Sequence, residues 1–419
     1  MNLLHVNAAY PPFIGGAEVY TEAMSQRFAD DGHDVTVVAT DAAEVEYFWN
    51  PRKRHLPAVP GLRNGVRIER CPVSHLPLSP WSFYLLRRLA TIMGRWPALS
   101  APILRRFAPL MPGVPDIADR LEVLGGGFDL VHGINVALEW PLIAAWRCAR
   151  RRGLPFVTTP FVHVGESGRR DVLINYTMPH QLEVLQDADA VVVQTDIERR
   201  ALEQRGVAGE RIHRLGMGVD LDEHRGGDAA RFRAEHEMTG PIVTFLGVVT
   251  YDKGSFHLVQ AMERIWSRGS TAHLVIAGPP VDEFERFYRG LPAATRRRIT
   301  LLGTVLGREK QDLLAATDVF ALPSRIDSFG IVYLEAWAYE KPVIGARAGG
   351  VPDVIDEGLN GLLVEFGNPD ELAGAVESLL ADPDRARSMG RYGRMRVEER
   401  YTWDHIHDRL KAIYRRCLA

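Results

Sequence analysis

Cysteine and long apolar runs are both scarce in this chain. It has three cysteines in 419 residues, far apart at Cys71, Cys148 and Cys417. That number excludes a disulfide framework or a cysteine-built zinc site, and it fits a reducing compartment. No uncharged apolar stretch approaches the roughly 18 residues that a membrane-spanning helix requires. The first residues, MNLLHVNAAYPP, also lack the basic start of a signal peptide. We therefore expect a cytoplasmic protein with no membrane span.

The chain also lacks an excess of either charge. Lys and Arg number 50 and Asp and Glu number 53, for a net charge of −3, and 46% of the residues are hydrophobic. This near balance argues against a nucleic-acid-binding protein. The length is sufficient for two globular domains, each with its own core. The sequence contains neither an internal repeat nor a low-complexity segment.

The first 40 residues predict the opening of a doubly wound sheet. Buried strands are expected at Asn2–Asn7 and Asp34–Thr40, with a helix over residues 17–30 between them. The loop before that helix holds Gly15 and Gly16. Two glycines leave room for a ligand to approach the backbone near the helix amino terminus.

Alternating strands and helices resume at Phe128. Strands are expected in FDLVHG, PFVTTPF and AVVVQT, with helices between them. His132 and His163 stand near the carboxyl ends of the first two of these strands. Parallel sheets bind their ligands at that edge, so both histidines are candidate site residues.

A second sheet is expected after residues 224–240, a polar stretch that we interpret as a hinge. The sheet opens with PIVTFLG and continues with HLVIAG, ITLLG and DVFALP. Lys253 follows the first of these strands, in a loop that leads into a helix. A lysine beside a helix amino terminus suits a diphosphate.

The last of these strands runs into the segment that carries the clearest functional signal. Asp327 lies in a loop beside Phe329 and Gly330, and Glu335 follows inside an apolar-periodic helix. Between the two acids lie the first free N–H groups of that helix, which bind anions. Carboxylates accept hydrogen bonds from sugar hydroxyls, so the segment predicts a site for a nucleotide sugar.

Residues 50–115 interrupt the α/β pattern and are strongly basic. They include one acid, Glu69, and a net charge of +10 here leaves −13 for the rest of the chain. The basic residues are Arg52, Lys53, Arg54, Arg63, Arg67, Arg70, Arg87, Arg88, Arg95, Arg105 and Arg106. We interpret this segment as an acceptor-side insertion that contacts an anionic membrane surface, a lipid-linked acceptor or an anionic glycan.

Within the insertion, Trp81–Trp96 predicts a basic amphipathic helix. Its apolar face would hold Trp81, Phe83, Leu85, Leu86, Leu89, Ile92, Met93 and Trp96, and its other face Tyr84, Arg87, Arg88 and Arg95. Such a helix either lies in a membrane surface or packs on its own domain with a solvated basic face. The sequence leaves both alternatives open.

The run from Asp327 to Glu335, DSFGIVYLE, resembles the acid-x7-acid element of retaining glycosyltransferases of family 4. That family usually has Glu at both ends, so Asp327 is one methylene shorter. GGAE at 15–18, GMGVD at 216–220 and YTW at 401–403 are also similar to segments of the family. The resemblance covers nearly the whole chain except about residues 50–115.

The resemblance implies an α/β chain with the GT-B fold, in which two doubly wound Rossmann-like domains face each other across a cleft. The acceptor-side domain would span residues 1–225 and the nucleotide-sugar domain 238–400. A helix at about 402–419 would cross back to the first domain.

The resemblance also implies roles for residues at matching positions. His163 would lie beside the reacting carbon of the sugar, although two more residues than usual separate it from the preceding Thr. Lys253 would bind the diphosphate, Asp327 the donor sugar and Glu335 the ribose hydroxyls. Further contacts would come from Gly15, Gly16, Gly247, Val305, Arg325, Phe329, Gly330 and Ile331.

Two further sequence features concern the binding of phosphate and of metal. Most family members carry an Arg at the position of Val248, and Arg325 is a nearby candidate to replace it. Asp187 and Asp189 form a D-x-D, the motif with which other glycosyltransferases hold a divalent cation. Their place at a helix end marks them as a turn instead, so we expect no metal.

The implied function is retaining, metal-independent transfer of a hexose from a UDP- or GDP-sugar to a glycan or lipid-linked acceptor. It would serve polysaccharide or glycoconjugate synthesis, without a cofactor, in the cytoplasm or peripherally on the inner face of the cytoplasmic membrane. Two alternatives share the fold: a nucleotide-sugar 2-epimerase and a catalytically weak donor-binding subunit. An NAD-dependent dehydrogenase is disfavoured because Gly15-Gly16 is not G-x-G-x-x-G.

Overall fold

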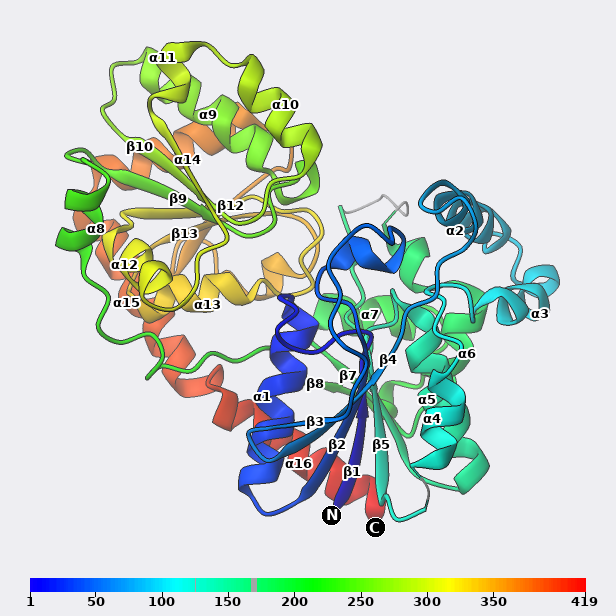
Figure 1. The fold of residues 1–419 in the computed structure, drawn as a ribbon. Helices are drawn as coiled ribbons and strands as arrows, with labels where there is room; N and C mark the ends of the chain where they lie inside the picture. The colour runs from blue at the N-terminus through cyan, green and yellow to red at the C-terminus, as the bar shows by residue number, and fades with distance from the viewer. Residues whose placement is uncertain (125, 167–171) are drawn as a thin grey trace. The chain divides into compact units, whose positions relative to one another are not determined.

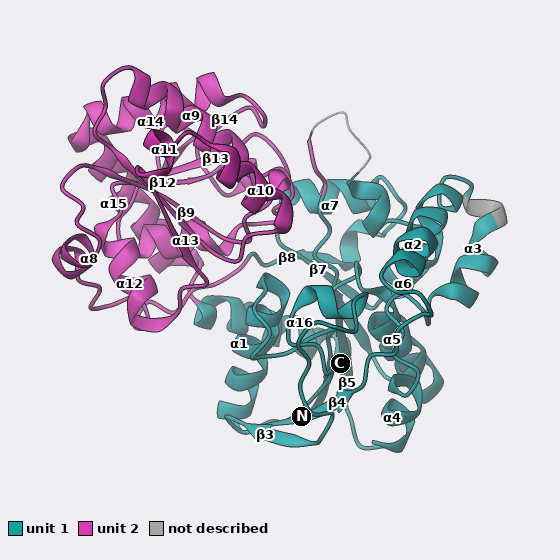
Figure 2. Cartoon of the chain, turned by 45° about the horizontal axis from the view of Figure 1, so that its top comes forward, with its two compact units in different colours: residues 1–163, 170–216, 403–419 teal, residues 164–169, 217–402 magenta. Residues whose placement is uncertain are grey.

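The computed structural model describes residues 1–124, 126–166 and 172–419, apart from the side chains of residues 97–99. It contains two compact units (Figure 2). Unit 1 comprises residues 1–163, 170–216 and 403–419. Unit 2 comprises residues 164–169 and 217–402. Each unit is built on one sheet.

The sheet of unit 1 has eight strands, all parallel except the edge strand β3. In sheet order they are β3 (Gly61–Arg63), β4 (Val66–Cys71), β2 (Asp34–Thr40), β1 (Asn2–Val6), β5 (Leu130–Ile134), β6 (Phe156–Thr159), β7 (Ala190–Val193) and β8 (Ile212–Arg214). Five predicted strands are confirmed. They are the two that flank the first helix in sequence and those in FDLVHG, PFVTTPF and AVVVQT.

Helices flank this sheet on both faces (Figure 1). They are α1 (Gly16–Asp30), α2 (Trp81–Met93), α3 (Pro97–Phe107), α4 (Ile117–Val123), α5 (Glu139–Arg152), α6 (Pro179–Asp187), α7 (Asp196–Glu203) and α16 (Trp403–Leu418), with the 3₁₀ turns η1 (Val45–Phe48), η2 (Leu173–Tyr176) and η3 (Gly209–Arg211). The two-sided cover explains why β1 is apolar without alternation: Leu3, Leu4 and Val6 are all fully buried.

The sheet of unit 2 has six strands, and every pair is parallel. In sheet order they are β11 (Ile299–Gly303), β10 (His273–Ala277), β9 (Ile242–Leu246), β12 (Val319–Leu322), β13 (Val343–Ala346) and β14 (Gly361–Val364). The order reverses between β9 and β12, so ligand-binding loops are expected at the carboxyl ends of those two strands.

The helices of unit 2 complete the α/β alternation. They are α8 (Ala229–Glu235), α9 (Ser255–Ser267), α10 (Asp282–Gly290), α11 (Ala293–Arg296), α12 (Gly307–Ala316), α13 (Ile331–Ala338), α14 (Pro369–Ala381) and α15 (Pro383–Arg400), with the turns η4 (Tyr251–Lys253) and η5 (Val351–Asp353). The stretch at 224–240 that we interpreted as a hinge contains α8. Arg231 of α8 donates to Asp312 of α12 at 2.7 Å, so this stretch is anchored to unit 2.

The carboxyl-terminal helix α16 belongs to unit 1 and lies beside α1 (Figure 1). Tyr414 stacks on Phe28 of α1 with ring centroids 4.9 Å apart. Its hydroxyl also lies 2.5 Å from Nδ1 of His132 and 3.1 Å from Nε2 of His5. The helix that follows YTW is therefore part of the core of the first unit, as the sequence predicts.

His132 does not lie at an open ligand edge, contrary to expectation. Its side chain is buried between Tyr414 and Thr159, and Nε2 lies 2.8 Å from the Thr159 hydroxyl. Burial lowers its pKa well below 6.5, so the imidazole is neutral. We conclude that His132 is a structural residue that links β5 to α16.

Candidate functional site

The carboxyl end of β12 and the start of α13 hold the two acids of the DSFGIVYLE run. Gly330 precedes α13 with φ of +83°, and a Cβ there would overlap the ring of Tyr333, so only glycine fits. Phe329 is buried and packs edge-to-face on Tyr401, with ring centroids 5.4 Å apart. The loop therefore has a fixed shape, and the N–H of Ile331 heads the first turn of the helix.

Lys253 and Asp327 form an ion pair across this loop. The Nζ of Lys253 lies 2.6 Å from Oδ1 of Asp327, and their side chains are 20% and 14% exposed. Lys253 ends η4, whose first turn is capped by the Thr250 hydroxyl. Gly254 follows with φ of +81°, and a Cβ there would overlap the carbonyl of Pro323. The loops after β9 and β12 are thus in direct contact, and they bring together the predicted cation and the predicted acid.

Glu335 lies inside α13 and is buried. Its Oε1 accepts a hydrogen bond from Nζ of Lys310 on α12 at 2.7 Å. Its Oε2 has no hydrogen-bond partner among the described residues. A buried carboxylate oxygen without a partner is costly in an isolated protein. It is therefore available to accept a hydrogen bond from a ligand hydroxyl. Sequence reasoning missed Lys310, because a lysine 25 residues before Glu335 carries no motif.

Arg325 is held by two carboxylates of unit 2. Its Nε donates to Oδ1 of Asp252 at 2.8 Å, and its Nη1 donates to Oε2 of Glu166 at 3.0 Å. The guanidinium also lies 5.1 Å from the centre of the Phe366 ring. The positive charge of Arg325 is therefore already paired within the protein. Val248, the position at which the resemblance predicts an Arg, is exposed.

Two more predicted residues lie at the ends of neighbouring strands. Gly247 follows β9, and its N–H donates to the carbonyl of Ala277 at 2.9 Å. Val305 follows β11 and is buried. The structure thus places both at the carboxyl edge of the unit 2 sheet, the same edge that carries Lys253 and Asp327.

In unit 1, Gly15 and Gly16 lie at the start of α1. Gly15 precedes the helix, and a Cβ there would overlap the carboxylate of Glu18, whereas a Cβ at Gly16 would meet nothing within 4 Å. Glu18 is buried, and burial raises its pKa to about 7. The glycine pair therefore has two roles: Gly15 makes room for a buried acid, and Gly16 leaves the backbone open.

His163 follows β6 in a loop of unit 1. Its Nδ1 lies 2.9 Å from the hydroxyl of Tyr176, with the two rings 4.8 Å apart. The preceding residue, Val162, donates its N–H to Oε1 of Glu198 at 2.7 Å. His163 is therefore positioned from both sides, by an aromatic hydroxyl and by an anchored backbone.

Glu198 is a residue that sequence reasoning missed. Its Oε2 also accepts the N–H of Gln194 at 2.8 Å, so one buried carboxylate joins the ends of β6 and β7. Burial raises its pKa to about 7. The run from Thr195 to Glu198 fits a capping box, in which the acid would bond its own helix start. That sequence pattern predicts a capping role for Glu198. Only the tertiary fold shows that its carboxylate instead bonds the loop that contains Val162.

The D-x-D motif is engaged by an arginine. Nε of Arg150 donates to Oδ2 of Asp187 at 2.6 Å, and its Nη1 donates to Oδ2 of Asp189 at 2.9 Å. Oδ2 of Asp189 also accepts the N–H of Phe156, at the start of β6. The two acids therefore fasten α5 to the end of α6 and to β6.

A surface pocket of about 560 Å³ lies on α2 and is lined by none of the predicted site residues. Its lining is Tyr84, Arg87, Arg88, Thr91, Ile92, Arg95 and Asn175, all of unit 1. The residues predicted to bind the donor are instead on unit 2, where contacts between loops hold Lys253 and Asp327. The pocket is considered below, as part of the basic insertion.

Comparison with known proteins extends over nearly the whole chain. Residues 14–223 match the family model "Glycosyltransferase Family 4", and residues 228–396 match "Glycosyl transferases group 1". Alpha-maltose-1-phosphate synthase of Mycolicibacterium smegmatis is 37% identical over 44% of this chain and 50% of its own length. D-inositol 3-phosphate glycosyltransferase of Segniliparus rotundus is 29% identical over 65% of this chain and 63% of its own length. The alignments thus span less than two thirds of these two relatives.

The crystal structure of Anabaena Alr3699/HepE in complex with UDP and glucose is similar in fold. It superposes with a TM-score of 0.73 at 18% identity, and the match covers 99% of both chains. Together with the two family models, this match confirms the GT-B architecture predicted from the sequence.

Proposed function

This chain belongs to the family 4 glycosyltransferases, and we propose that it transfers a hexose from a UDP- or GDP-sugar to a glycan or lipid-linked acceptor. The transfer would retain the anomeric configuration, need no metal and serve polysaccharide or glycoconjugate synthesis. The observation that carries this proposal is the contact of Lys253 with Asp327 beside the amino terminus of α13. A cation, backbone N–H groups and a carboxylate there match the phosphate and the hydroxyls of such a donor.

The leaving diphosphate is the group that needs most stabilisation. When the bond between the anomeric carbon and the phosphate oxygen breaks, the electron pair remains on the diphosphate and the sugar becomes oxocarbenium-like. Lys253 and the N–H groups around Phe329, Gly330 and Ile331 would stabilise that negative charge from fixed positions. The acceptor hydroxyl attacks from the same face, and its proton passes to the leaving phosphate oxygen, so no protein base is required.

The two acids would hold the donor at its two sugars. Glu335 has a buried oxygen that finds no hydrogen-bond partner in the described part of the chain, and a second oxygen that accepts a hydrogen bond from Lys310. A carboxylate oriented in this way suits the two hydroxyls of a ribose. Asp327, on the other side of the helix start, would bind hydroxyls of the transferred hexose. It would also hold the ammonium of Lys253 in place until the diphosphate arrives.

The remaining predicted residues would contact either the donor nucleotide or the acceptor and the transferring sugar. Arg325 would provide a second positive charge if a diphosphate draws it away from Asp252 and Glu166. Gly247 and Val305 would approach the nucleotide at the carboxyl edge of the unit 2 sheet. On unit 1, Gly15, Gly16 and His163 would face the acceptor and the transferring sugar.

An activity assay on purified protein tests this proposal. Thermal-shift screening against UDP-, GDP- and ADP-sugars first identifies the donor by its stabilising effect. Turnover is then followed by mass spectrometry with an acceptor panel that includes D-inositol 3-phosphate, because one relative is named for it. We expect a glycosylated product whose yield is unchanged by EDTA.

Three outcomes would overturn parts of the proposal. Conversion of the donor sugar to its 2-epimer without any acceptor would indicate an epimerase. Donor binding without turnover on any acceptor would indicate a binding subunit. Activity that EDTA abolishes and Mg²⁺ or Mn²⁺ restores would exclude the metal-independent mechanism.

A further inference from the structure

The apolar face predicted for α2 is divided in two by the fold. Phe83, Leu86, Ala90 and Met93 face the protein, where Leu86, Ala90 and Met93 pack with Leu104, Met111 and Met178. A second set remains exposed: Trp81 (78%), Leu85 (59%), Leu89 (47%), Ile92 (40%) and Trp96 (59%). Packing on its own domain therefore accounts for only half of the apolar residues of this helix.

Four members of the exposed set form a continuous stripe on α2. At 100° per residue, Trp81, Ile92, Leu85 and Leu89 fall within one arc of about 80°. Trp96, which the sequence placed in the same helix, follows the end of α2 at Met93 and extends the exposed apolar surface beyond it. An apolar patch with aromatic ends is unusual on a surface that faces only water.

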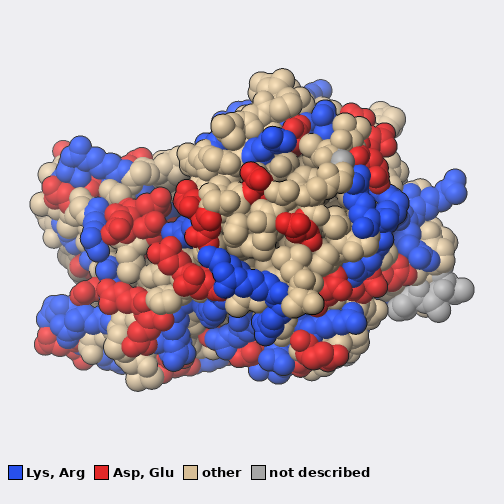
Figure 3. Space-filling model, turned by 90° about the horizontal axis from the view of Figure 1, so that it is seen from below, with Lys and Arg blue, Asp and Glu red and all other residues tan. Residues whose placement is uncertain are grey.

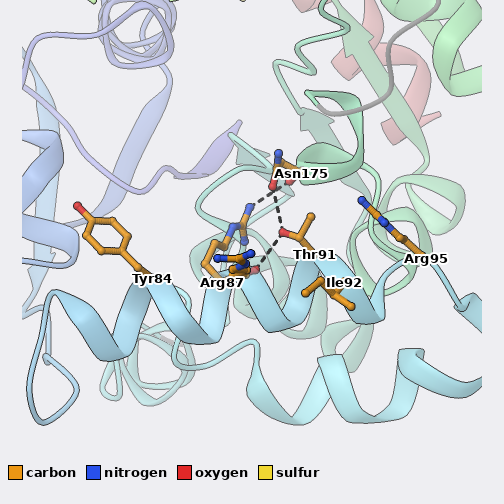
Figure 4. Close-up of a pocket in the computed structure, with 7 residues that line it drawn as sticks. Tyr84, Arg87, Thr91, Ile92, Arg95 and Asn175 are labelled. Atoms are coloured by element: carbon orange, nitrogen blue, oxygen red, sulfur yellow. Dashed lines mark hydrogen bonds between the residues drawn. The ribbon is translucent and has the colours of Figure 1, made fainter. Parts of the chain in front are cut away.

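Arginines flank one side of this stripe. Figure 4 shows Tyr84, Arg87, Thr91 and Arg95 on the same side of α2, with Asn175 facing them. Arg87 is structural, because its Nη1 donates to the fully buried carboxylate of Glu139 at 2.7 Å. The side chains of Arg88 and Arg95, by contrast, form no ion pair or hydrogen bond with the described part of the chain.

The residues that line the pocket on α2 carry charge of one sign. No acid is among the residues that line the pocket, and residues 50–115 carry eleven basic residues against one acid. On the face shown in Figure 3, Lys and Arg lie interspersed with Asp and Glu. Five of the eleven basic residues form ion pairs, namely Lys53, Arg54, Arg63, Arg87 and Arg105. Arg88 and Arg95, whose side chains have no partner among the described residues, lie beside the exposed apolar stripe.

We propose that the α2 face, formed by the stripe and by Arg88 and Arg95, docks this protein onto a bilayer that contains anionic phospholipids. Trp81 and Trp96 would lie at the level of the headgroups, Leu85, Leu89 and Ile92 would enter the boundary of the acyl chains, and the two arginines would bind lipid phosphates. A soluble glycan or inorganic phosphate would use the arginines but not five apolar side chains. No helix among the described residues is long and apolar enough to cross a bilayer.

This inference is independent of the transfer reaction, because vesicle binding can be measured without any sugar donor. Purified protein is sedimented with vesicles of phosphatidylcholine mixed with phosphatidylglycerol, and with vesicles of phosphatidylcholine alone. We expect binding to the mixed vesicles only, reduced by added salt because surface charges are screened. The double variant Leu85→Glu/Leu89→Glu should weaken binding by at least about tenfold, since it places charge in the apolar boundary.

Matched variants separate docking from general effects. Arg88→Ala/Arg95→Ala removes only the two charges of the pocket that lack an ion-pair partner among the described residues. We expect about a thirtyfold loss of binding, because each basic residue near an anionic surface contributes roughly 1 kcal/mol. Val123→Glu places a charge on another exposed apolar position of unit 1, and Arg67→Ala removes another exposed arginine of the same insertion. Both controls should bind nearly as the wild type does, and circular dichroism confirms that each variant is folded.

The proposal would be overturned if the wild type failed to sediment with the mixed vesicles. It would also be overturned if Leu85→Glu/Leu89→Glu bound to them as tightly as Val123→Glu does. Loss of binding in the arginine variant alone would indicate electrostatic adsorption without insertion. A wild-type dimer in solution that Leu85→Glu/Leu89→Glu converts to a monomer would show that a second copy, not a bilayer, covers the stripe.

Discussion

The ammonium of Lys253 lies 2.6 Å from the carboxylate of Asp327, and this pair joins two loops that are 74 residues apart in the sequence. Both side chains are mostly buried. In a site that binds a diphosphate, the pair orients the lysine and limits the cost of burying its charge. The two residues therefore act together, but we expect variants of the two to affect the affinity for nucleoside diphosphate differently.

The first prediction concerns the two charged groups assigned to the donor. Lys253→Ala and Glu335→Ala should each lower the rate of transfer by on the order of 10²-fold or more, because each removes a preorganised contact to the donor. Steady-state turnover measures the effect, and thermal unfolding shows whether the fold is kept. Arg286→Ala, an exposed cation on α10 of the same unit, is the control. Wild-type rates from both site variants would remove these assignments.

Asp327→Asn tests the division of roles within the ion pair. The variant keeps the size of the side chain but releases Lys253, so we expect transfer to fall while the affinity for free nucleoside diphosphate is unchanged or increases. Lys253→Ala should instead weaken that affinity. Titration calorimetry with UDP and GDP distinguishes the two. Equal loss of nucleotide affinity in both variants would show that Asp327 does not act on the sugar.

Glu198 should act as a positioning residue for His163. Glu198→Ala leaves the buried N–H groups of Val162 and Gln194 without acceptors, at about 1–3 kcal/mol for each unpaired group. We expect a lower free energy of unfolding and a turnover rate that falls further than donor affinity does. Glu203→Ala, on the same helix, removes an exposed ion pair with Arg199 and should change little. If Glu203→Ala had the same effects, the anchoring role would be excluded.

Glu18 makes stability depend on pH. Burial raises its pKa from 4.5 to about 7, so the unfolded chain ionises more readily than the folded one. Below pH 4.5 the protonated side chain makes its full contribution to the free energy of unfolding. That contribution is lost as the pH rises from 4.5 through 7. Glu18→Gln cannot ionise, so wild type should lose up to about 3 kcal/mol relative to this variant between pH 4.5 and 8.

Chemical denaturation at several pH values measures that difference. Glu22→Gln removes a partly exposed carboxylate from the same helix and provides the control, because its side chain accepts a hydrogen bond from Arg63. It should keep the pH dependence of the wild type. Parallel curves for wild type and Glu18→Gln would show that Glu18 ionises normally in the folded protein.

Local pattern was sufficient for most of the elements and for the order of the site residues. Apolar runs predicted five of the eight strands of the unit 1 sheet and four of the six of the unit 2 sheet, since a parallel sheet covered on both faces needs no alternation. The strands β3, β4, β8, β13 and β14 were not predicted, and β4, which lies in residues 50–115, continues the sheet by pairing with β2. The spacing from Asp327 to Glu335 placed one acid before a helix and one inside it, because that relation depends only on nearby residues. Gly330 and the helix start between them followed from the same local geometry.

Contacts between distant residues were decided by the tertiary structure alone. The pairing of Lys310 with Glu335, the hold of Asp252 and Glu166 on Arg325, and the burial of His132 against Tyr414 join segments that no periodicity connects. The same holds for α2, where the sequence shows one wide apolar face. Which half of that face meets the protein core depends on where α3 and α6 pack, and only the folded chain leaves the other half exposed.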